Sequence, residues 1–599
     1  MKSLVQAFAV TLLFLMGVNG VDEAARAETP SRIVAITGAM IFDATGKAPY
    51  RGTVIIRNDR IVDVGPEVKA PAGAQVVNAD GNALLPGFFD VHTHWGPSGT
   101  PGTIPQIANR YVASGVTTVN DFHQQPESFA PRRAWLANLV APHVNFIART
   151  STPNGHGADW GDANTTKWIA TPEAARREIQ ALQPYHPDHI KAFADGWRYG
   201  TSPEETSMNL ETLSALADEA HKYGQRVLSH TVTVERGKIA ARAGVDVIAH
   251  SLQDRQIDAE GIALIKQAGT YYAPTLAIYA PVKPGATETP DRTDPAVQHR
   301  FRKYGFAEYN VKALHDAGVP IALGTDAGIG DAQHGTSTLQ EMELLVDAGL
   351  SSAEALLAGT INSARALGID ADRGTIEQGK RADLVLINGT PWKDIADVHK
   401  IDRVFIDGQL VFGSGANRPS ANQRTSLESA PAAVLIDDFT RTDGRSSLDT
   451  LRLADMDGGG DRSVVVMNLV PRGEGDQALL VTARMAQKET PSGGVIIPLS
   501  RGSVQPVDAS KFSGIRLELR GEGRYLIMIN TLNGVWRADV EAGAEWKNIE
   551  LPFSAFEKVK RSGETTASWR GDDLLQIGLK GQRPAGATMW AELDNVRFY

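Results

Sequence analysis

The sequence predicts an α/β protein in which a (β/α)8 TIM-like barrel is inserted into a small β-sandwich and is followed by an all-β domain. Three observations predict this fold class. Short apolar strands alternate with helical stretches from Leu84 to about Ala366, and a closed barrel is the natural architecture for about 280 residues of parallel βα units. Val- and Ile-rich stretches with frequent turns flank this region. The last part of the chain shows strand-like runs with little helical periodicity.

We interpret residues 1–27 as a signal peptide. A basic start at Lys2 precedes an apolar run from Leu4 to Val18 and the small-x-small tripeptide Ala25-Arg26-Ala27, which signal peptidase accepts. The alternative is an uncleaved N-terminal anchor, but the run is short for a membrane span, and no other stretch approaches about 18 consecutive apolar residues. We therefore expect an exported protein, periplasmic or secreted, without stable membrane insertion.

The small β-sandwich is predicted from two segments, residues 31–83 and 370–415, on either side of the barrel. Each strand is a short apolar or alternating run between turn residues. The expected strands are Arg32–Thr37, Gly52–Arg57, Arg60–Val64, Gly374–Ile376, Ala382–Ile387, Ile401–Ile406 and Gln409–Val411. The N-terminal strands alone are too few to bury a core, so we expect the two segments to form one unit.

The barrel is assigned to residues 84–369. Expected strands are Leu84–Phe89, Val144–Arg149, His189–Phe193, Gln225–Ser229 and Val245–Ala249, and expected helices include Pro172–Leu182, Asn209–Tyr223 and Ala307–Ala317. This regular change between strand and helix periodicity is typical of βα units. Residues 416–432 are polar and rich in turn-forming residues, which predicts a linker.

The last domain is predicted over residues 433–599 as an all-β sandwich or jelly roll. Expected strands are Val464–Asn468, Leu479–Arg484, Gly514–Arg520, Tyr525–Asn530 and Leu574–Leu579. Because the preceding linker is where few contacts should cross a domain boundary, we expect a chain truncated after residue 428 to keep its activity on small substrates.

Composition excludes several classes of protein. The chain has 599 residues, 42% of them apolar and 22% charged, which is ordinary for globular proteins and excludes a disordered or fibrous chain. The net charge of −10 gives no electrostatic case for a nucleic-acid partner. The absence of cysteine excludes disulfides, thiolate nucleophiles and Cys-ligated zinc, and leaves His, Asp, Glu and Lys to carry any metal chemistry.

Polar residues at the ends of the apolar runs form a candidate metal site. His92 and His94 are two residues apart on one strand, so their side chains point to the same side. Alone, this His-x-His pair is a weak signal. The further candidates end or follow other strands, where barrel active sites lie; they are Lys191, His230, His250 and Asp326. Imidazole and carboxylate groups are ligands that Zn²⁺ accepts, which predicts a metal centre.

Lys191 requires a separate explanation, because a dication would repel an ammonium group. A lysine in this position should lose its proton, and its free amine can add carbon dioxide to give an anionic carbamate that can bridge two metals. The alternative is a lysine that pairs with a carboxylate or binds the substrate.

At these residues the chain resembles the amidohydrolase superfamily, in particular the imidazolonepropionase-like branch with metal-dependent Xaa-Pro dipeptidases. The resemblance covers residues 31 to 415. It depends on Leu85–His94, Ser114–Val119, Gly244–His250, Gly324–Asp326 and Gly379–Val385.

The resemblance implies two divalent metal ions, with zinc expected. It implies that His92 and His94 bind the more buried ion, that His230 and His250 bind the other, and that a carboxylated Lys191 bridges them. By the same resemblance, Asp326 contacts the buried metal and transfers a proton. His156, on the loop Thr152–Gly157, is similar to a histidine that contacts substrate in this branch.

One departure from the branch concerns recognition of a substrate carboxylate. The branch often has a tyrosine or histidine two residues after the histidine of the fifth strand, where this chain has Val232, which cannot donate a hydrogen bond. Tyr279 could substitute, although packing is the alternative role. The remaining histidines considered were interpreted as surface or structural residues: His123, His186, His189 and His334.

The region from Val434 to Tyr599 resembles the complex I intermediate-associated protein family, which implies a galactose-binding-like jelly roll. The resemblance depends on Leu435–Phe439, Phe512–Leu517, Gly521–Tyr525, Trp546–Phe553 and Leu593–Val596. Its tryptophans are either core residues or a stacking surface for a sugar or peptide; they are Trp536, Trp546, Trp569 and Trp590. A carbohydrate or protein partner of this domain, and a homo-oligomer, are left open.

The sequence thus predicts a metal-dependent hydrolase that cleaves an amide or peptide-like C–N bond of a small substrate, a dipeptide or an N-acyl amino acid. A metal-bridging hydroxide would be the nucleophile, because metal binding lowers the pKa of water. Alternatives are a lactonase or esterase, or an isomerase, lyase or decarboxylase on the same scaffold. A non-catalytic binding protein is a further alternative.

Overall fold

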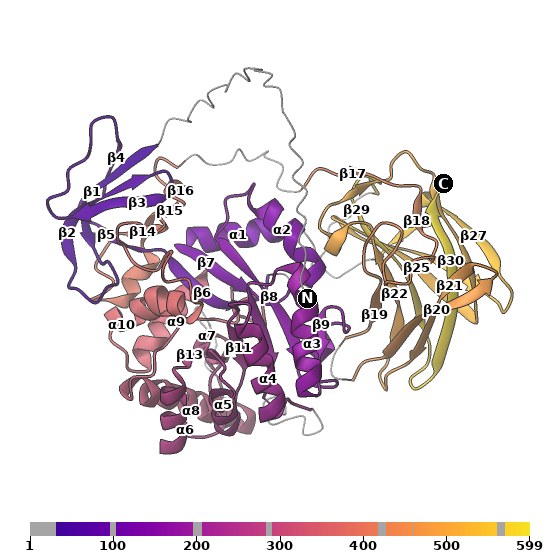
Figure 1. Ribbon diagram of the computed structural model, residues 1–599, viewed down its shortest axis with the longest axis horizontal. Coiled ribbons are helices and arrows are strands. Elements are labelled where there is room, and N and C mark those ends of the chain that lie inside the picture. Colours follow the sequence, from indigo (N-terminus) through magenta and orange to yellow (C-terminus); the bar gives the residue numbers. More distant parts are fainter. Residues whose placement is uncertain are drawn as a thin grey trace, which may run out of the picture.

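The computed structural model describes residues 32–95, 103–195, 206–282, 290–416, 427–458, 461–559 and 569–599. The predicted signal peptide, residues 1–27, and most of the predicted linker lie outside the described residues. Among the helices of the described ranges, none combines the length and the apolar character that crossing a membrane requires. Figure 1 shows a small sheet, a central barrel and a C-terminal β domain arranged in a row.

The barrel is built from parallel strands in chain order. These are β6 (Phe88–Thr93), β7 (Val116–Asp121), β8 (His143–Ser151), β10 (His189–Phe193), β11 (Val227–His230), β12 (Val247–Ala249) and β13 (Tyr271–Ala273), with β9 (Thr166–Trp168) added to β8. Residues 320–327 take the eighth position. Ala322 N–H donates to Tyr272 O at 2.9 Å and Val91 N–H donates to Leu323 O at 2.9 Å. This segment therefore joins β13 to β6 and closes the barrel, as predicted.

Helices surround the barrel. They are α1 (Ile104–Ala113), α2 (Phe129–Leu136), α3 (Pro172–Leu182), α4 (Leu210–His221), α5 (Val234–Arg242), α6 (Ala259–Ala268), α7 (Leu276–Tyr279), α8 (Pro295–Asp316), α9 (Thr336–Asp347), α10 (Ser352–Leu357) and α11 (Ser363–Ala366). Local sequence explains their ends: Thr171 caps α3 by accepting the N–H of Ala174, with Pro172 at the first position, and Gly269 ends α6 in a left-handed conformation. Helix α3 has its predicted bounds, whereas α8 begins well before the predicted Ala307.

The two segments that flank the barrel form one β unit, as predicted. Its strands are β1 (Ile33–Ile41), β2 (Tyr50–Arg57), β3 (Arg60–Gly65), β4 (Gln75–Asn78), β5 (Ala83–Pro86), β14 (Leu384–Ile387), β15 (Ile401–Ile406) and β16 (Gln409–Gly413). Pairing of β14 with β5 joins the segments into one hydrogen-bonded sheet that packs around its own apolar core. The prediction of a strand at Gly374–Ile376 is wrong, because Gly374 has φ +101° and interrupts the extended conformation.

The apolar run Leu84–Phe89, predicted as one barrel strand, is two strands in different sheets. Strand β5 belongs to the small sheet and β6 to the barrel, and the chain crosses between them at Gly87. Gly87 N–H donates to Asp383 O at 2.8 Å. A Cβ at this position would lie 2.2 Å from Thr117 Oγ1, so the close approach of the two units requires glycine.

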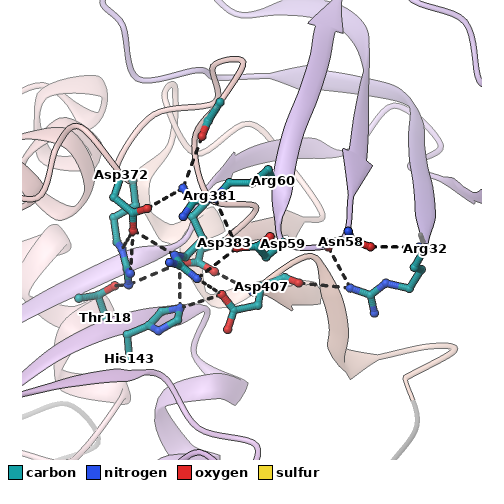
Figure 2. Close-up of polar contacts among 12 residues, drawn as sticks. Arg32, Asn58, Asp59, Arg60, Thr118, His143, Asp372, Arg381, Asp383 and Asp407 are labelled. Carbon is teal, nitrogen blue, oxygen red and sulfur yellow. Dashed lines mark hydrogen bonds and ion pairs between the residues drawn. The ribbon is translucent and has the colours of Figure 1, made fainter. Parts of the chain in front are cut away.

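An ion-pair network ties the small sheet to the barrel (Figure 2). Asp372 accepts from Arg60 Nη1 at 2.6 Å and from Arg381 Nε at 3.0 Å. His143 on β8 lies 3.2 Å from the buried Asp383 Oδ2. Burial alone would raise the pKa of Asp383, but the contact with His143 brings it below its ordinary value. Because Arg373 and Arg381 also pair with acids of this network, we interpret it as structural.

The C-terminal domain is a sandwich of two sheets, as predicted. One contains β17 (Ala430–Pro431), β19 (Leu453–Met456), β22 (Ser492–Pro498), β23 (Val507–Asp508), β25 (Gly523–Thr531), β26 (Gly534–Ala542), β28 (Glu557–Lys558) and β29 (Leu574–Gln582). The other contains β18 (Leu435–Asp437), β20 (Val464–Gly473), β21 (Asp476–Arg484), β24 (Gly514–Gly521), β27 (Lys547–Pro552) and β30 (Thr588–Phe598). Trp536 belongs to the core between them and meets Trp569 edge to face at 5.3 Å.

This domain packs on the barrel segments that follow β7 and β8 (Figure 1). Arg445 Nη2 donates to the buried Glu127 at 2.6 Å, and Asp162 Oδ2 accepts the N–H of Ala454 at 2.9 Å. Val504 joins the hydrophobic core of the barrel. Few contacts were expected between these two domains, so this packing corrects the expectation from the sequence.

Candidate metal centre

The predicted ligands come together at the C-terminal end of the barrel strands. His92 lies in β6 and His94 just after it, Lys191 lies in β10, and His230 ends β11. His250 follows β12 directly, and Asp326 lies near the end of the closing segment, residues 320–327. All six side chains are buried, with at most 6% of any residue exposed. This is where catalytic groups of a TIM barrel are expected.

His92, His94 and Asp326 form the first cluster. Asp326 Oδ1 lies 2.9 Å from His94 Nε2 and 3.4 Å from His92 Nε2. Lys191 Nζ lies 3.1 Å from His92 Nε2, and Phe122 covers it at 4.6 Å. The lysine therefore lies at the edge of the cluster in an apolar setting.

His156, Asp195 and His230 form the second cluster. Asp195 Oδ2 lies 2.9 Å from His156 Nδ1 and 3.2 Å from His230 Nε2. The ring of His250 lies between the two clusters, with its centroid 4.1 Å from that of His230 and 4.4 Å from that of His92. The two clusters are thus continuous.

Asp195 is a further residue of the site that was not predicted from the sequence. It follows β10 by two residues and Lys191 by four, which is the same signal of a polar residue after a buried strand that identified His250. Asp90 was also missed; its buried carboxylate accepts from Thr325 Oγ1 at 2.7 Å and Thr338 Oγ1 at 2.8 Å. Through Thr325, it fixes the backbone next to Asp326.

Two of the proposed metal ligands have a strained backbone. His250 has φ 78° and Asp326 has φ 62°, in the left-handed region that residues with a side chain rarely adopt. Thr275, with φ 49°, lies with its Oγ1 3.0 Å from His250 Nδ1. Each residue in this conformation lowers the stability of the fold by on the order of 1 kcal/mol. Such a conformation persists where the surrounding structure fixes a functional geometry.

Burial sets the protonation of the cluster. It lowers the pKa of His230 to about 3 and that of His92, His94 and His250 well below the ordinary histidine value, so these imidazoles are neutral at pH 7. Burial also lowers the pKa of Lys191 to about 7 and raises that of Asp326 to about 7.

Asp195 differs from Asp326. Burial alone would raise its pKa, but the neighbouring His230 and His156 bring it well below its ordinary value, so Asp195 is an anion at neutral pH.

The donor set fits divalent metal ions. In each cluster, one ligand atom from every residue lies within 4.8 Å of the others. The imidazoles of His92, His94 and His230 are neutral and have available lone pairs. Within the described ranges, the buried Nδ1 atoms of His92 and His94 have no hydrogen-bond partner. Imidazole and carboxylate are ligands of zinc and related ions, so these clusters could bind metal.

Aromatic residues line the approach to the clusters. The ring centroid of Trp160 lies 5.4 Å from that of His94, 5.9 Å from that of His156 and 5.6 Å from that of His123. From the sequence, His123 is interpreted as a surface or structural residue. Val232 is buried, and the ring of Tyr279 meets His250 edge to face at 6.0 Å.

Comparison with family models divides the chain in the same way as the fold. The model of the Amidohydrolase family matches residues 83–411, and that of the Complex I intermediate-associated protein 30 family matches residues 439–581. The first match covers more than half of the chain.

Curated relatives match more than half of the chain. A 5'-deoxyadenosine deaminase from Methanothermobacter thermautotrophicus is 25% identical over 437 residues, 64% of this chain and 93% of the relative. An imidazolonepropionase from Caldanaerobacter subterraneus subsp. tengcongensis is 29% identical over 373 residues, 56% of this chain and 83% of the relative. Among solved structures, a candidate prolidase from Bifidobacterium longum is 27% identical with a TM-score of 0.56, covering 65% of this chain and 96% of that one.

Proposed function

Because the chain belongs to the amidohydrolase family, we propose that it cleaves an amide or peptide-like C–N bond of a small substrate, a dipeptide or an N-acyl amino acid. The observation that carries the proposal is the pair of continuous, buried clusters at the C-terminal end of the barrel strands. Enzymes of this family are metal-dependent, and the relatives include a deaminase and a candidate prolidase, which act on C–N bonds.

Two divalent ions, with zinc as the expected metal, would be held by the two clusters. The first cluster, His92, His94 and Asp326, would hold one ion, and His230 of the second cluster would hold the other together with the adjacent His250. When bound, such ions supply a Lewis acid for the scissile carbonyl and lower the pKa of water. The neutral state of the four imidazoles supports this assignment.

Lys191 is proposed to carry a carbamate between the two ions. Burial lowers the pKa of Lys191 far below the ordinary lysine value, which favours the free amine. The amine adds to carbon dioxide with loss of one proton and becomes an anion, which removes the repulsion between an ammonium and the metals. Its position 3.1 Å from His92 supports this role.

Asp326 and His156 are the proposed catalytic side chains. Asp326 would take the proton that leaves the attacking water and pass it to the leaving nitrogen. His156, held by Asp195 at 2.9 Å and facing Trp160, would contact the substrate carbonyl.

We expect the purified protein to contain about two equivalents of zinc or a similar divalent metal per chain, measured by elemental analysis. His143→Ala is the matched control. His143 belongs to a His/Asp group outside the barrel mouth, and arginines already neutralise the acids of that group. The His143→Ala variant should keep both equivalents of metal. No bound metal after reconstitution with zinc and bicarbonate would refute the assignment. One equivalent would indicate a mononuclear site without the carbamate.

The test of the proposed reaction is a library of dipeptides and N-acyl amino acids, with lactones and simple esters included, offered to the metal-loaded protein. We expect turnover of substrates with a C–N bond, detected as released amine. Turnover of lactones or esters alone would favour the esterase alternative. Full metal content without any hydrolysis would refute the proposal.

A further inference from the structure

A cavity of about 310 Å³ lies between the barrel mouth and the C-terminal domain. The barrel contributes residues in and after β7 and β8, including His123, Arg149 and Trp160. The C-terminal domain contributes β19 and neighbouring segments, with Arg462 and Gln576 among the lining residues. Both domains are therefore needed to form this space.

The cavity adjoins the candidate metal centre. Trp160, which lines it, lies with its ring centroid 5.4 Å from His94 of the first cluster and 5.9 Å from His156 of the second. A substrate whose scissile bond reaches the clusters could therefore extend past Trp160 into the cavity.

Arg149 is a buried charge in the wall of this cavity. It lies on β8, is 3% exposed, and its Nε and Nη1 have no hydrogen-bond partner within the described residues. Its guanidinium carbon lies 5.6 Å from the Trp160 ring. Burial lowers the pKa of Arg149 to about 10, so the group stays charged at neutral pH. A buried charge without a hydrogen-bonded counter-ion is strongly unfavourable, which points to a ligand.

The nearby carboxylates bond to other groups. Asp121 accepts from two backbone N–H groups, at 3.0 and 2.9 Å, and from Gln124 Nε2 at 2.8 Å. Asp162 Oδ2 accepts from the N–H of Ala454 at 2.9 Å. The charges of Asp121, Asp159 and Asp162 raise the pKa of Arg149 through space, and Asp159 also lines the cavity. Among the described residues, no hydrogen bond joins these acids to Nε or Nη1 of Arg149.

We propose that this cavity is a subsite for a carboxylate of the substrate, with Arg149 as the residue that binds it; the proposal depends on the proposed function for its reaction. A planar guanidinium with free N–H groups matches a carboxylate in geometry and charge. Val232 cannot supply the hydrogen bond, so another residue must hold such a group. Arg462 adds positive charge from the C-terminal domain while donating to Gly161 O at 2.8 Å.

The subsite makes the C-terminal domain part of the substrate site. From the sequence we predict that a chain ending at residue 428 keeps turnover of small substrates within a few-fold of the full-length protein. Because residues 453–456, 458, 462 and 576 supply one wall of the cavity, we do not expect that result for substrates with a free carboxylate.

The test compares N-acetylleucine with N-acetylleucinamide on the full-length protein and on Arg149→Met and Arg149→Lys. Binding is measured by calorimetry, and kcat/KM is measured where turnover occurs. We expect the wild type to bind the acid more tightly than the amide. Arg149→Met should weaken binding of the acid by roughly 30- to 100-fold and change binding of the amide by less than about threefold. Arg149→Lys keeps the charge and should recover part of the preference.

A purely structural role for Arg149 would lower binding of the acid and the amide equally, and that result would overturn the subsite. Equal or undetectable affinity of the wild type for the two ligands would also overturn it. Because binding does not require turnover, selective binding of the acid without hydrolysis would support the subsite and contradict the proposed function.

Discussion

Asp326→Asn is expected to lower kcat by about 10²- to 10⁴-fold, the usual contribution of a positioned acid–base group, while at least one metal ion stays bound. The amide has nearly the shape of the carboxylate and can still accept at the position that lies 2.9 Å from His94. It cannot take up a proton from the attacking water. Burial raises the pKa of Asp326 to about 7, which suits a group that accepts and returns a proton near neutral pH.

The measurement is kcat on a substrate from the library, with metal content determined on the same sample. Asp383→Asn is the matched control, since Asp383 is also buried but lies in the ion-pair network of the small sheet (Figure 2). The control should keep kcat within a few-fold. Near-normal turnover of a metal-loaded Asp326→Asn variant would remove this residue from the mechanism.

Much of the fold could be predicted because periodicity is a local signal. The bounds of His189–Phe193, Pro172–Leu182 and Ile401–Ile406 agree with the structure. The division of Leu84–Phe89 at Gly87 could not be predicted, because both strands are apolar and only the close approach of Thr117 shows that the chain changes sheets there.

The site could be predicted in part, since each strand of a barrel delivers its last residues to one end. That rule located His92, His94, His230 and His250 together. It did not single out Asp195, because a polar residue two positions past a strand is as typical of an ordinary loop.

The cavity could not be predicted, since it depends on how two domains pack against each other. The sequence predicts Arg149 as the last residue of an ordinary strand. Only the placement of β19 opposite it shows a charge enclosed between two domains.

Glu127→Ala is expected to destabilise the contact between the barrel and the C-terminal domain by about 3 kcal/mol, the lower end of the cost of removing one partner from a buried ion pair. The lower end applies because Arg445 keeps 17% of its side chain exposed, whereas Glu127 keeps 4%. The contact with Glu127 raises the pKa of Arg445, so the arginine stays charged in the variant. It loses its hydrogen-bonded carboxylate and keeps Asp449, whose Oδ1 lies 3.9 Å from Arg445 Nε.

Urea unfolding of Glu127→Ala, Arg445→Met and the double variant gives the coupling between the two side chains. We expect the double variant to lose clearly less stability than the two single variants together, because neither charge is then left alone at the interface. The single variants should also lower kcat/KM on substrates with a free carboxylate, since the ion pair holds one wall of the Arg149 cavity in place. Strictly additive losses of stability, with unchanged kcat/KM, would show that this pair does not fix the C-terminal domain on the barrel mouth.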